Sequence, residues 1–462
     1  MYKTITITIL AMHLVSCGGS KSRIESNLPL ANTPSLLVCS NPYNNNYPSD
    51  YMGKFQIPIP LGELDPSIAK RGISFKDYFG GTSFKITGER NTNGEPVWSG
   101  CTQEEFTKMV YLLSLERMRD SGATFAWVYN YAPWVDVEPD LLEVSIENYQ
   151  ITDEIMNWLV KQAEGMGIEI YFAWQFTTSD ISGESFYEMN TIPSLPTLKK
   201  IMDAHETNII KQAIFAESIG IKGLAADWNA MNICFCGDDK ELLKEYYIER
   251  LSIIISKIRN EFGGQILVGQ TFNIFNDERI FSKIDMLYLS ITGNFKTIIS
   301  AEENITLSTE LIKDLSLDYF KYEYEKMYCL DEQPCWSGSS KIVLPVMVNY
   351  SAQSKDDYFV TGWSEDGFCT EGTLSDGSTV DCIQNFYTTD FSVQAIGMDG
   401  MLQAIVQQPY FQIEAVDVHT GYWLADTLVP DDSGFPNLSQ SIRGKPAEKI
   451  VKYWYTGIYA EQ

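Results

Sequence analysis

The 462-residue chain is poor in basic residues and in histidine: it has 34 Lys and Arg against 61 Asp and Glu, and three His. The formal net charge of −27 argues against nucleic acids and anionic membrane surfaces as ligands, because their phosphates need a basic partner. The acidity suits a neutral or cationic ligand, although it more often serves only solubility. The few histidines also leave few metal ligands, so we expect neither a metal nor a cofactor.

The chain also lacks the short motifs that identify several enzyme classes. It contains no Walker loop, no HExxH pair and no serine nucleophile elbow. A Gly-rich phosphate turn after an early strand is missing as well, which argues against a nucleotide-binding doubly wound sheet.

Long apolar runs are absent too, and the leader, residues 1–16, is too short to span a bilayer as a mature helix. Its end, Leu14-Val15-Ser16-Cys17, resembles the bacterial lipobox, in which cleavage leaves a cysteine that carries lipid, including palmitate. The resemblance implies a signal peptide over 1–16 and a lipid anchor at Cys17 in the bacterial cell envelope, at the outer membrane. Alternatively, the leader is an ordinary secretory signal and Cys17 is incidental.

Eight cysteines follow Cys17, and an even number in an exported chain permits disulfides. Cys329–Cys335 and Cys369–Cys382 each flank a polar loop and are the preferred pairs, with Cys39–Cys101 as a weaker one. Cys234-Phe235-Cys236 has the composition of a partial zinc site, but a disulfide framework fits the few histidines better.

A regular alternation of strand and helix patterns follows an irregular tether over 17–75. Short β-branched or aromatic runs predict strands at Thr82–Ile86, Ala123–Tyr131, Ile168–Phe176, Ile221–Asn229, Gln265–Thr271, Asp285–Ile291, Ile342–Asn349 and Phe411–His419. Amphipathic patterns predict helices at Thr102–Asp120, Thr152–Gly165, Leu198–Gly220, Glu241–Gly263, Asp390–Gln408 and Pro446–Tyr459, several ending at a glycine C-cap (Gly122, Gly167, Gly220, Gly263).

This pattern favours an α/β fold: a single (β/α)8 TIM barrel over 76–462, with loop insertions at Glu302–Lys341 and around Cys369–Cys382. A doubly wound sheet is the alternative fold. In a barrel, the carboxyl ends of the strands form the mouth where chemistry takes place.

Two aspartates at strand ends are the candidate catalysts. Strand alternation puts Asp227 and Asn229 on one face, and Asp417 and His419 on one face of the last strand. Carboxylates facing each other across the mouth at about 6.5–9.5 Å would suit an inverting glycosidase. We therefore expect Asp227 as general acid and Asp417 as base or electrostatic partner, while Asn229 and His419 orient sugar hydroxyls. The alternatives are that Asp227 only forms hydrogen bonds and that His419 is structural.

Aromatic residues make up 13% of the chain, and several follow predicted strands. We expect Trp134, Trp174 and Trp423 to stack against sugar rings at the mouth, although each could equally pack in the core. Other acids near strand ends are more commonly loop residues: Asp136, Glu138, Asp180 and Asp277.

Several segments resemble the TIM-barrel glycoside hydrolases, most of all the β-mannanase-like branch of family 113. The closing Ser441-Ile-Arg-Gly-Lys-Pro-Ala-Glu-Lys-Ile-Val is the most specific of them, beside Gly165–Phe176 and Ile258–Leu267. The resemblance implies a Glu acid/base after strand four and a Glu nucleophile after strand seven. Asn229 stands at the first position, and Asn349 or Tyr350 at the second, where they would contact substrate.

The sequence thus predicts a monomeric, surface-anchored glycoside hydrolase-like lipoprotein that acts on an oligo- or polysaccharide. An amide cannot protonate a leaving glycosidic oxygen, so the departures keep a second hypothesis open. That hypothesis is a glycan-binding lipoprotein that has lost the usual catalytic glutamates.

Overall fold

A computed structural model describes one part of the chain in detail. The described residues are 68, 70–76, 103–138, 141–144, 151–177, 194–227, 238–270, 277–289, 308–327, 341–346, 352–354, 372–373, 379–380, 387–389, 391–423 and 441–457. The chain divides into Met1–Val38 and Cys39–Gln462, and every described residue belongs to the second unit. Within these residues no helix is long and apolar enough to cross a membrane. The lipobox and all nine cysteines lie outside them.

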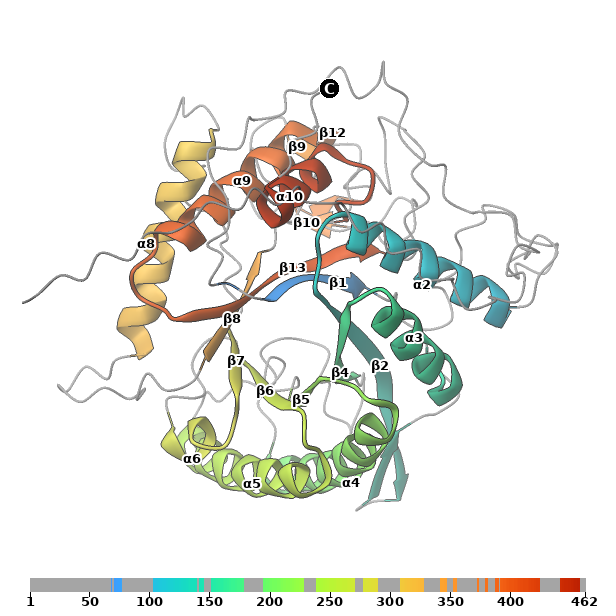
Figure 1. Ribbon diagram of the computed structural model, residues 1–462. Helices are drawn as coiled ribbons and strands as arrows, with labels where there is room; N and C mark the ends of the chain where they lie inside the picture. The colour runs from blue at the N-terminus through green and yellow to red at the C-terminus, as the bar shows by residue number, and fades with distance from the viewer. Residues whose placement is uncertain are drawn as a thin grey trace, which may run out of the picture. The chain divides into compact units, whose positions relative to one another are not determined.

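Eight parallel strands close into a barrel (Figure 1). In spatial order they are β1 (Lys70–Lys76), β13 (Ile413–Trp423), β8 (Lys341–Val346), β7 (Met286–Leu289), β6 (Gln265–Gln270), β5 (Gly223–Asp227), β4 (Glu169–Thr177) and β2 (Phe125–Glu138). The ring closes because β1 pairs with β13 on one side and with β2 on the other. The end of β2 also forms an antiparallel hairpin with β3 (Leu141–Val144).

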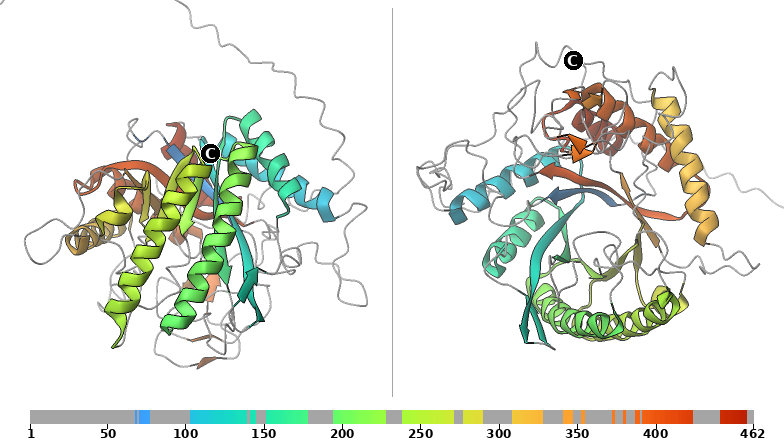
Figure 2. Two further views of the ribbon diagram at one scale, coloured as in Figure 1. Left: turned by 90° about the horizontal axis from the view of Figure 1, so that it is seen from below. Right: turned by 180° about the vertical axis from the view of Figure 1, so that it is seen from behind.

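A helix follows each barrel strand in the chain. These helices are α2 (Gln103–Asp120), α3 (Asp153–Gly165), α4 (Leu195–Ile219), α5 (Lys240–Glu261), α6 (Glu278–Phe281), α8 (Thr309–Met327), α9 (Phe391–Gln407) and α10 (Pro446–Thr456). The long helices α4 and α5 lie side by side outside the sheet (Figure 2). Between β8 and α9 the chain forms two small antiparallel sheets, β9 (Ala352–Ser354) with β12 (Tyr387–Thr389) and β10 (Gly372–Thr373) with β11 (Thr379–Val380).

Local sequence explains where several helices begin and end. The side chains of Thr152 and Ser194 cap α3 and α4 by accepting hydrogen bonds from backbone N–H groups of the first turn. Gly220 ends α4 with φ 84°, a left-handed conformation that suits a residue without Cβ. Gly122 and Gly167 also have positive φ, as predicted.

The hydrophobic core has two layers. The layer between the sheet and the helices is mostly aliphatic, whereas half of the residues in the barrel interior are aromatic: Phe125, Trp127, Tyr129, Tyr171 and Tyr288. The Trp127 ring lies at the centre of this interior, with ring centroids 5.4 Å from Tyr171 and 5.7 Å from Tyr288. Small residues on neighbouring strands leave room for these rings.

The (β/α)8 prediction is confirmed, and each predicted strand after the first overlaps a barrel strand. The first strand was placed wrongly. The barrel starts at Lys70 rather than at residue 76, inside the segment that we expected to be an irregular tether, while Thr82–Ile86 lies outside the described residues. Only Ile73 and Phe75 of β1 carry its apolar pattern, because Gly72 and Ser74 face the crowded interior.

Two further predictions need correction. The segment Glu302–Lys341 is not a pure insertion, because it contains α8, the barrel helix that follows β7. Gly263 is not a left-handed C-cap. Instead, α5 ends at Glu261, and its C-cap residue is Phe262, which is extended with φ −134° and has a buried side chain.

Barrel closure generates the first prediction. A Cβ added to Gly72 would lie 2.3 Å from the ring of Phe125, its pairing partner on β2, and that ring is buried against Tyr171. Gly72→Ala should therefore lower the free energy of unfolding by roughly 1–3 kcal/mol through overpacking. Gly165→Ala is the matched control, because a Cβ there meets nothing within 4 Å and should be neutral or slightly stabilising. Equal urea midpoints for the two variants would contradict the closure argument.

A buried ion pair joins the first helix of the barrel to the last. The Arg117 guanidinium on α2 donates to the Glu448 carboxylate on α10, which also accepts from the Tyr422 hydroxyl of β13. The Arg443 guanidinium lies 4.9 Å from the Tyr422 ring centroid. Burial alone would raise the pKa of Glu448, but the charge and hydrogen bonds of Arg117 outweigh it and lower that pKa.

The lowered pKa fixes the sign of the second prediction. The ion pair stabilises the fold above the ordinary glutamate pKa of 4.5, and this contribution is lost as the pH falls through the folded-state value. Glu448→Gln should cost about 3 kcal/mol at pH 7, because it leaves a largely buried Arg117 without its counter-charge. Urea titrations should show the gap between variant and wild type shrinking below pH 4.5. Glu104→Gln, in an exposed pair with Lys108, is the control and should change stability little at either pH.

Candidate functional site

The candidate site is the floor of the barrel mouth, where side chains from three strands meet. Ser74 on β1, Tyr288 on β7 and Asp417 on β13 are each the last inward-facing residue of their strand whose side chain the structure describes. The carboxyl ends of the strands lie beyond them, which is where barrel enzymes bind their ligands.

Asp417 is the charged group of this floor. Its side chain is 0% exposed, and its Oδ2 accepts hydrogen bonds from Ser74 Oγ at 2.6 Å and from the Tyr288 hydroxyl at 2.9 Å. Burial, and then the charge of Asp417, raise the pKa of Tyr288 well above its usual 10, so the phenol stays protonated as a donor. The side chain of Tyr129 is hydrogen-bonded to Tyr288 and extends the polar cluster.

Asp227 does not face Asp417 across the barrel, contrary to the prediction from strand alternation. An extra residue, Ala226, interrupts the pairing of β5 with β6: Ala225 pairs with Leu267, but Asp227 pairs with Val268. Leu267 belongs to the barrel interior and Val268 to the layer beneath the helices, so the β-bulge turns Asp227 toward the helices.

The surroundings of Asp227 agree with this reversal. Its Oδ2 accepts a hydrogen bond from the hydroxyl of Tyr247, which projects from α5, and Asp227 is only 1% exposed. One helix away, His205 Nε2 on α4 donates to the carbonyl oxygen of Ala226 at 2.9 Å. The proposed pair of opposing carboxylates is therefore wrong in geometry.

The structure places the backbone, but not the side chains, of the predicted aromatic subsites. Trp134 pairs with Val144 in the β2–β3 hairpin, Trp174 pairs with Asn130, and Trp423 pairs with Lys76. The backbone of His419 lies in β13, two residues beyond Asp417. Their substrate contacts stay predictions, as do those of Asn229, Asn349 and Tyr350, which lie outside the described residues.

Asp277, one of the acids near strand ends, has a structural role. It caps α6 by accepting from the backbone N–H of Arg279 at 2.9 Å and forms an ion pair with the Arg279 guanidinium. The hydrogen bonds from Arg279 outweigh partial burial and lower the pKa of Asp277. Asp136 and Glu138 lie in the part of β2 that pairs with β3, and Asp180 lies outside the described residues.

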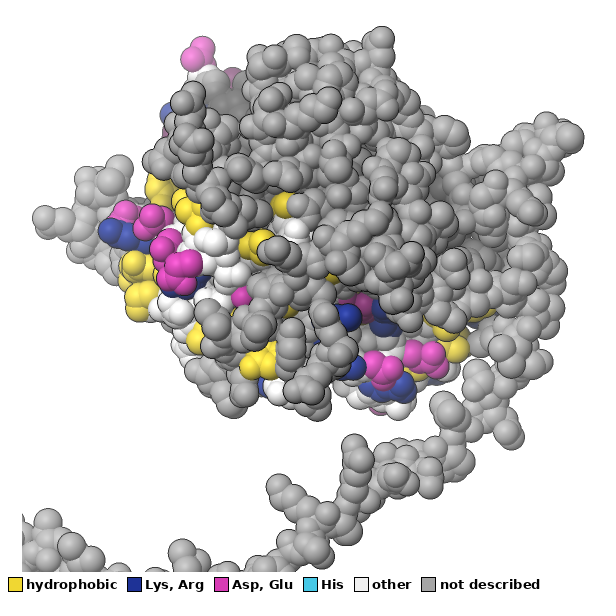
Figure 3. Space-filling model, turned by 90° about the horizontal axis from the view of Figure 1, so that it is seen from above, with side chains coloured by type: hydrophobic (Ala, Val, Ile, Leu, Met, Phe, Trp, Pro, Cys, Tyr) yellow, Lys and Arg dark blue, Asp and Glu magenta, His cyan; other side chains and the backbone are white. Residues whose placement is uncertain are grey.

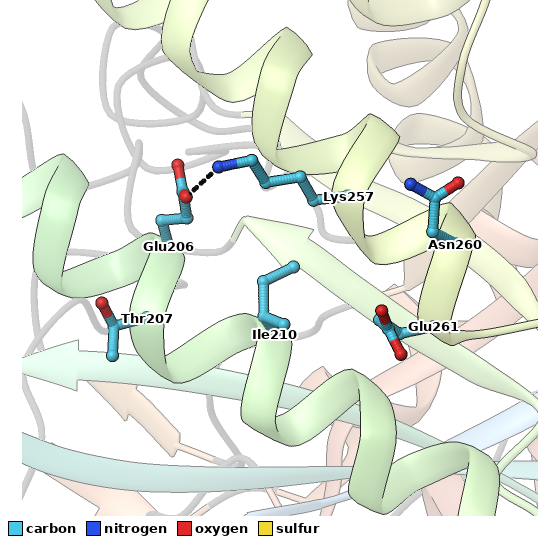
Figure 4. Close-up of a pocket in the computed structure, with 6 residues that line it drawn as sticks. All are labelled: Glu206, Thr207, Ile210, Lys257, Asn260 and Glu261. Atoms are coloured by element: carbon cyan, nitrogen blue, oxygen red, sulfur yellow. Dashed lines mark hydrogen bonds and ion pairs between the residues drawn. The ribbon is translucent and has the colours of Figure 1, made fainter.

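Charged side chains of both signs lie beside one another on the described surface shown in Figure 3. On the helices, Arg250 pairs with Asp203 and Lys257 with Glu206. A groove of about 360 Å³ runs between α4 and α5, lined by Glu206, Thr207, Ile210, Lys257, Asn260 and Glu261 (Figure 4). It lies on the outer helices, away from the barrel mouth.

The chemistry of the floor suits a neutral, hydroxyl-rich ligand. Among the described residues no group of three His, Cys, Asp or Glu could hold a metal ion. The serine and tyrosine hydroxyls of the floor both donate and accept hydrogen bonds, and the Asp417 carboxylate accepts them. Sugar hydroxyls need such partners.

Sequence reasoning missed four residues that shape this region: Ser74, Tyr129, Tyr288 and Tyr247. Tyr288 was visible in principle, because it alternates with Leu287 and Leu289 in the apolar run of β7. Tyr247 carried no such pattern, since an aromatic on the apolar stripe of a helix ordinarily indicates packing.

No protein-family model matches the chain, and no curated protein sequence matches it. Among solved structures, a GH113 beta-1,4-mannanase complex covers 86% of this chain and 100% of its own, with 13% identity and a TM-score of 0.48. A GH113 beta-mannanase from Alicyclobacillus acidocaldarius has 12% identity, coverage of 86% and 98%, and a TM-score of 0.48. Fungal beta-1,4-galactanase has 9% identity, coverage of 83% and 98%, and a TM-score of 0.42. At these values the similarities carry no residue role to this chain, and its fold assignment rests on its own strand pairing.

Proposed function

We propose that the protein is a glycoside hydrolase-like barrel that binds an oligo- or polysaccharide at the carboxyl-end mouth and cleaves its glycosidic bonds. The observation that carries the proposal is the interior carboxylate of Asp417, held by the hydroxyls of Ser74 and Tyr288. The resemblance of the closing segment to the β-mannanase-like hydrolases adds support from the sequence.

Asp417 has the electrostatic role in this proposal. Glycosidic bonds break through an oxocarbenium-like transition state, whose positive charge a nearby carboxylate stabilises most strongly where water is excluded. The hydroxyl donors hold that carboxylate in one orientation before the reaction begins. An acid from the loops that follow the strands would protonate the leaving oxygen as the glycosidic C–O bond breaks. Water would add to the sugar carbon and give its proton to a base, so that one proton is taken up and one is released.

The second candidate is a barrel that binds glycans without cleaving them. It is favoured by a specific observation: the β-bulge turns Asp227 toward α5, away from the place where a proton donor would work. The same polar floor would then supply hydrogen bonds to sugar hydroxyls, with no reaction following.

Asp417→Asn separates these functions. If the protein cleaves glycans, the variant should lose roughly 100-fold in kcat on a glycan that wild type hydrolyses, because the neutral amide removes the stabilising charge. Asp318→Asn, an exposed aspartate on α8, is the control and should retain wild-type rates. Glycan-array binding by wild type without products from any substrate would support the second candidate. Neither binding nor cleavage by wild type would contradict both.

We also propose that lipid on Cys17 anchors the protein in the cell envelope, with the acidic barrel outside the bilayer. The support is the sequence Leu14-Val15-Ser16-Cys17 and the Gly18-Gly19-Ser20 tether that follows it. A single acyl chain binds membranes only reversibly, so stable anchoring needs the several chains of a lipoprotein cysteine.

Cys17→Ala tests the anchor. When expressed in a bacterial host, the variant should fail to incorporate labelled palmitate. It should appear in the soluble fraction or as uncleaved precursor, and not as mature lipoprotein in the membrane fraction. Ser16→Ala, which keeps the cysteine, is the matched control and should still be lipidated. Labelling of Cys17→Ala equal to wild type would refute the anchor, whatever the barrel does with glycans.

A further inference from the structure

We infer that Tyr247 and His205 are positioning residues of the glycan site, because they hold the carboxyl end of β5 in a bulge from behind. The inference rests on the proposed function, since β5 is the barrel strand that runs to the mouth after α4. Neither residue belongs to the barrel interior: Tyr247 projects from α5 and His205 from α4.

The clamp consists of two hydrogen bonds on consecutive residues of β5. His205 Nε2 donates to the Ala226 carbonyl oxygen at 2.9 Å, and the Tyr247 hydroxyl donates to Asp227 Oδ2. Ala226 is the extra residue of the bulge, and Asp227 is the residue whose face the bulge reverses. Two helices therefore fix the irregular step of the strand, one through its backbone and one through its side chain.

Burial gives the clamp its strength. His205, Asp227 and Tyr247 are at most 3% exposed. A buried carboxylate is tolerated only where donors satisfy it, so the Tyr247 hydroxyl stabilises Asp227 on the helix side of β5. Without that hydroxyl the carboxylate is driven toward water, and the barrel mouth is the wet end of the strand.

The position of the bulge connects the clamp to the ligand. Side chains alternate along a strand with period two, so the extra residue Ala226 moves Asp227 from the inward to the outward face of β5. The clamp acts at the last two residues of β5. It thereby keeps the Asp227 carboxylate behind the sheet and out of the barrel mouth, without touching the ligand itself.

The Asp227→Asn substitution distinguishes a positioning residue from a general acid. If Asp227 were the general acid, Asp227→Asn would abolish cleavage, because an amide cannot donate the proton. A positioning residue keeps its role in that variant, because the amide oxygen still accepts from the Tyr247 hydroxyl. Asp227→Ala and Tyr247→Phe both remove the hydrogen bond, from opposite sides.

The experiment measures kcat and KM on a glycan that wild type cleaves, or affinity for one that it only binds. Tyr247→Phe and Asp227→Ala should each lower kcat/KM or affinity by roughly 10–100-fold, the usual effect of a displaced binding group. The double variant should be no worse than either single one. Asp227→Asn should stay within about twofold of wild type, because it retains the acceptor.

A second measurement needs no ligand. Hydrogen exchange of the backbone amides in Gly223–Asp227 should accelerate in Tyr247→Phe, while the other barrel strands keep wild-type protection. Tyr246→Phe is the matched control, because this neighbour on α5 is only half-buried and its ring lies 5.7 Å from Lys199 Nζ. It should leave exchange, activity and affinity unchanged.

The outcomes separate the two proposals. Loss of function in Asp227→Asn as severe as in Asp227→Ala would overturn the inference and make Asp227 a chemical participant. Wild-type exchange and wild-type kinetics in Tyr247→Phe would also overturn it. A wild-type protein that neither binds nor cleaves glycans would refute the proposed function, while the exchange measurement would still decide whether the clamp exists.

Discussion

The structure depends above all on the closure of the barrel between its first and second strands. β1 and β2 meet at a single register pair, Gly72 with Phe125, where the phenyl ring occupies the space that a side chain on Gly72 would need. Gly223 on β5 pairs with Tyr171 on β4, whose ring likewise occupies the space that a side chain on Gly223 would need. Large rings on β2, β4 and β7 thus fill much of the barrel interior, and glycine at these two contacts lets neighbouring strands pair without displacing the rings.

This aromatic filling also determines where polar chemistry can begin. The rings of Trp127 and Tyr171 occupy the interior below the mouth, so water and ligands are kept above them. Tyr288 belongs to both regions: its ring packs edge-on against Trp127, and its hydroxyl donates to Asp417. A phenol is suited to this border because one end is apolar and the other forms hydrogen bonds.

The architecture was predictable from the sequence because most barrel strands and helices carry their own periodic patterns. β1 was misplaced because half of its side chains face the interior as Gly72 and Ser74, which leaves too few apolar residues to form a pattern. The inward position of Asp417 followed from alternation, but the direction of Asp227 did not. The bulge has hydrogen-bond partners outside the strand, His205 on the preceding helix and Tyr247 on the following one, and no local pattern in β5 indicates it.

The two aspartates show that a buried carboxylate faces its hydrogen-bond donor, which agrees with strand parity at Asp417 and departs from it at Asp227. Both are almost completely buried, and each accepts from a tyrosine hydroxyl. For Asp417 that tyrosine is on β7, inside the barrel, whereas for Asp227 it is on α5, behind the sheet. The β-bulge in β5 brings Asp227 to its donor, and this hydrogen bond offsets the desolvation of the buried carboxylate. Among the residues that the structure describes, the charge at the floor of the mouth comes from β13, while β5 contributes a strand end fixed from outside the barrel.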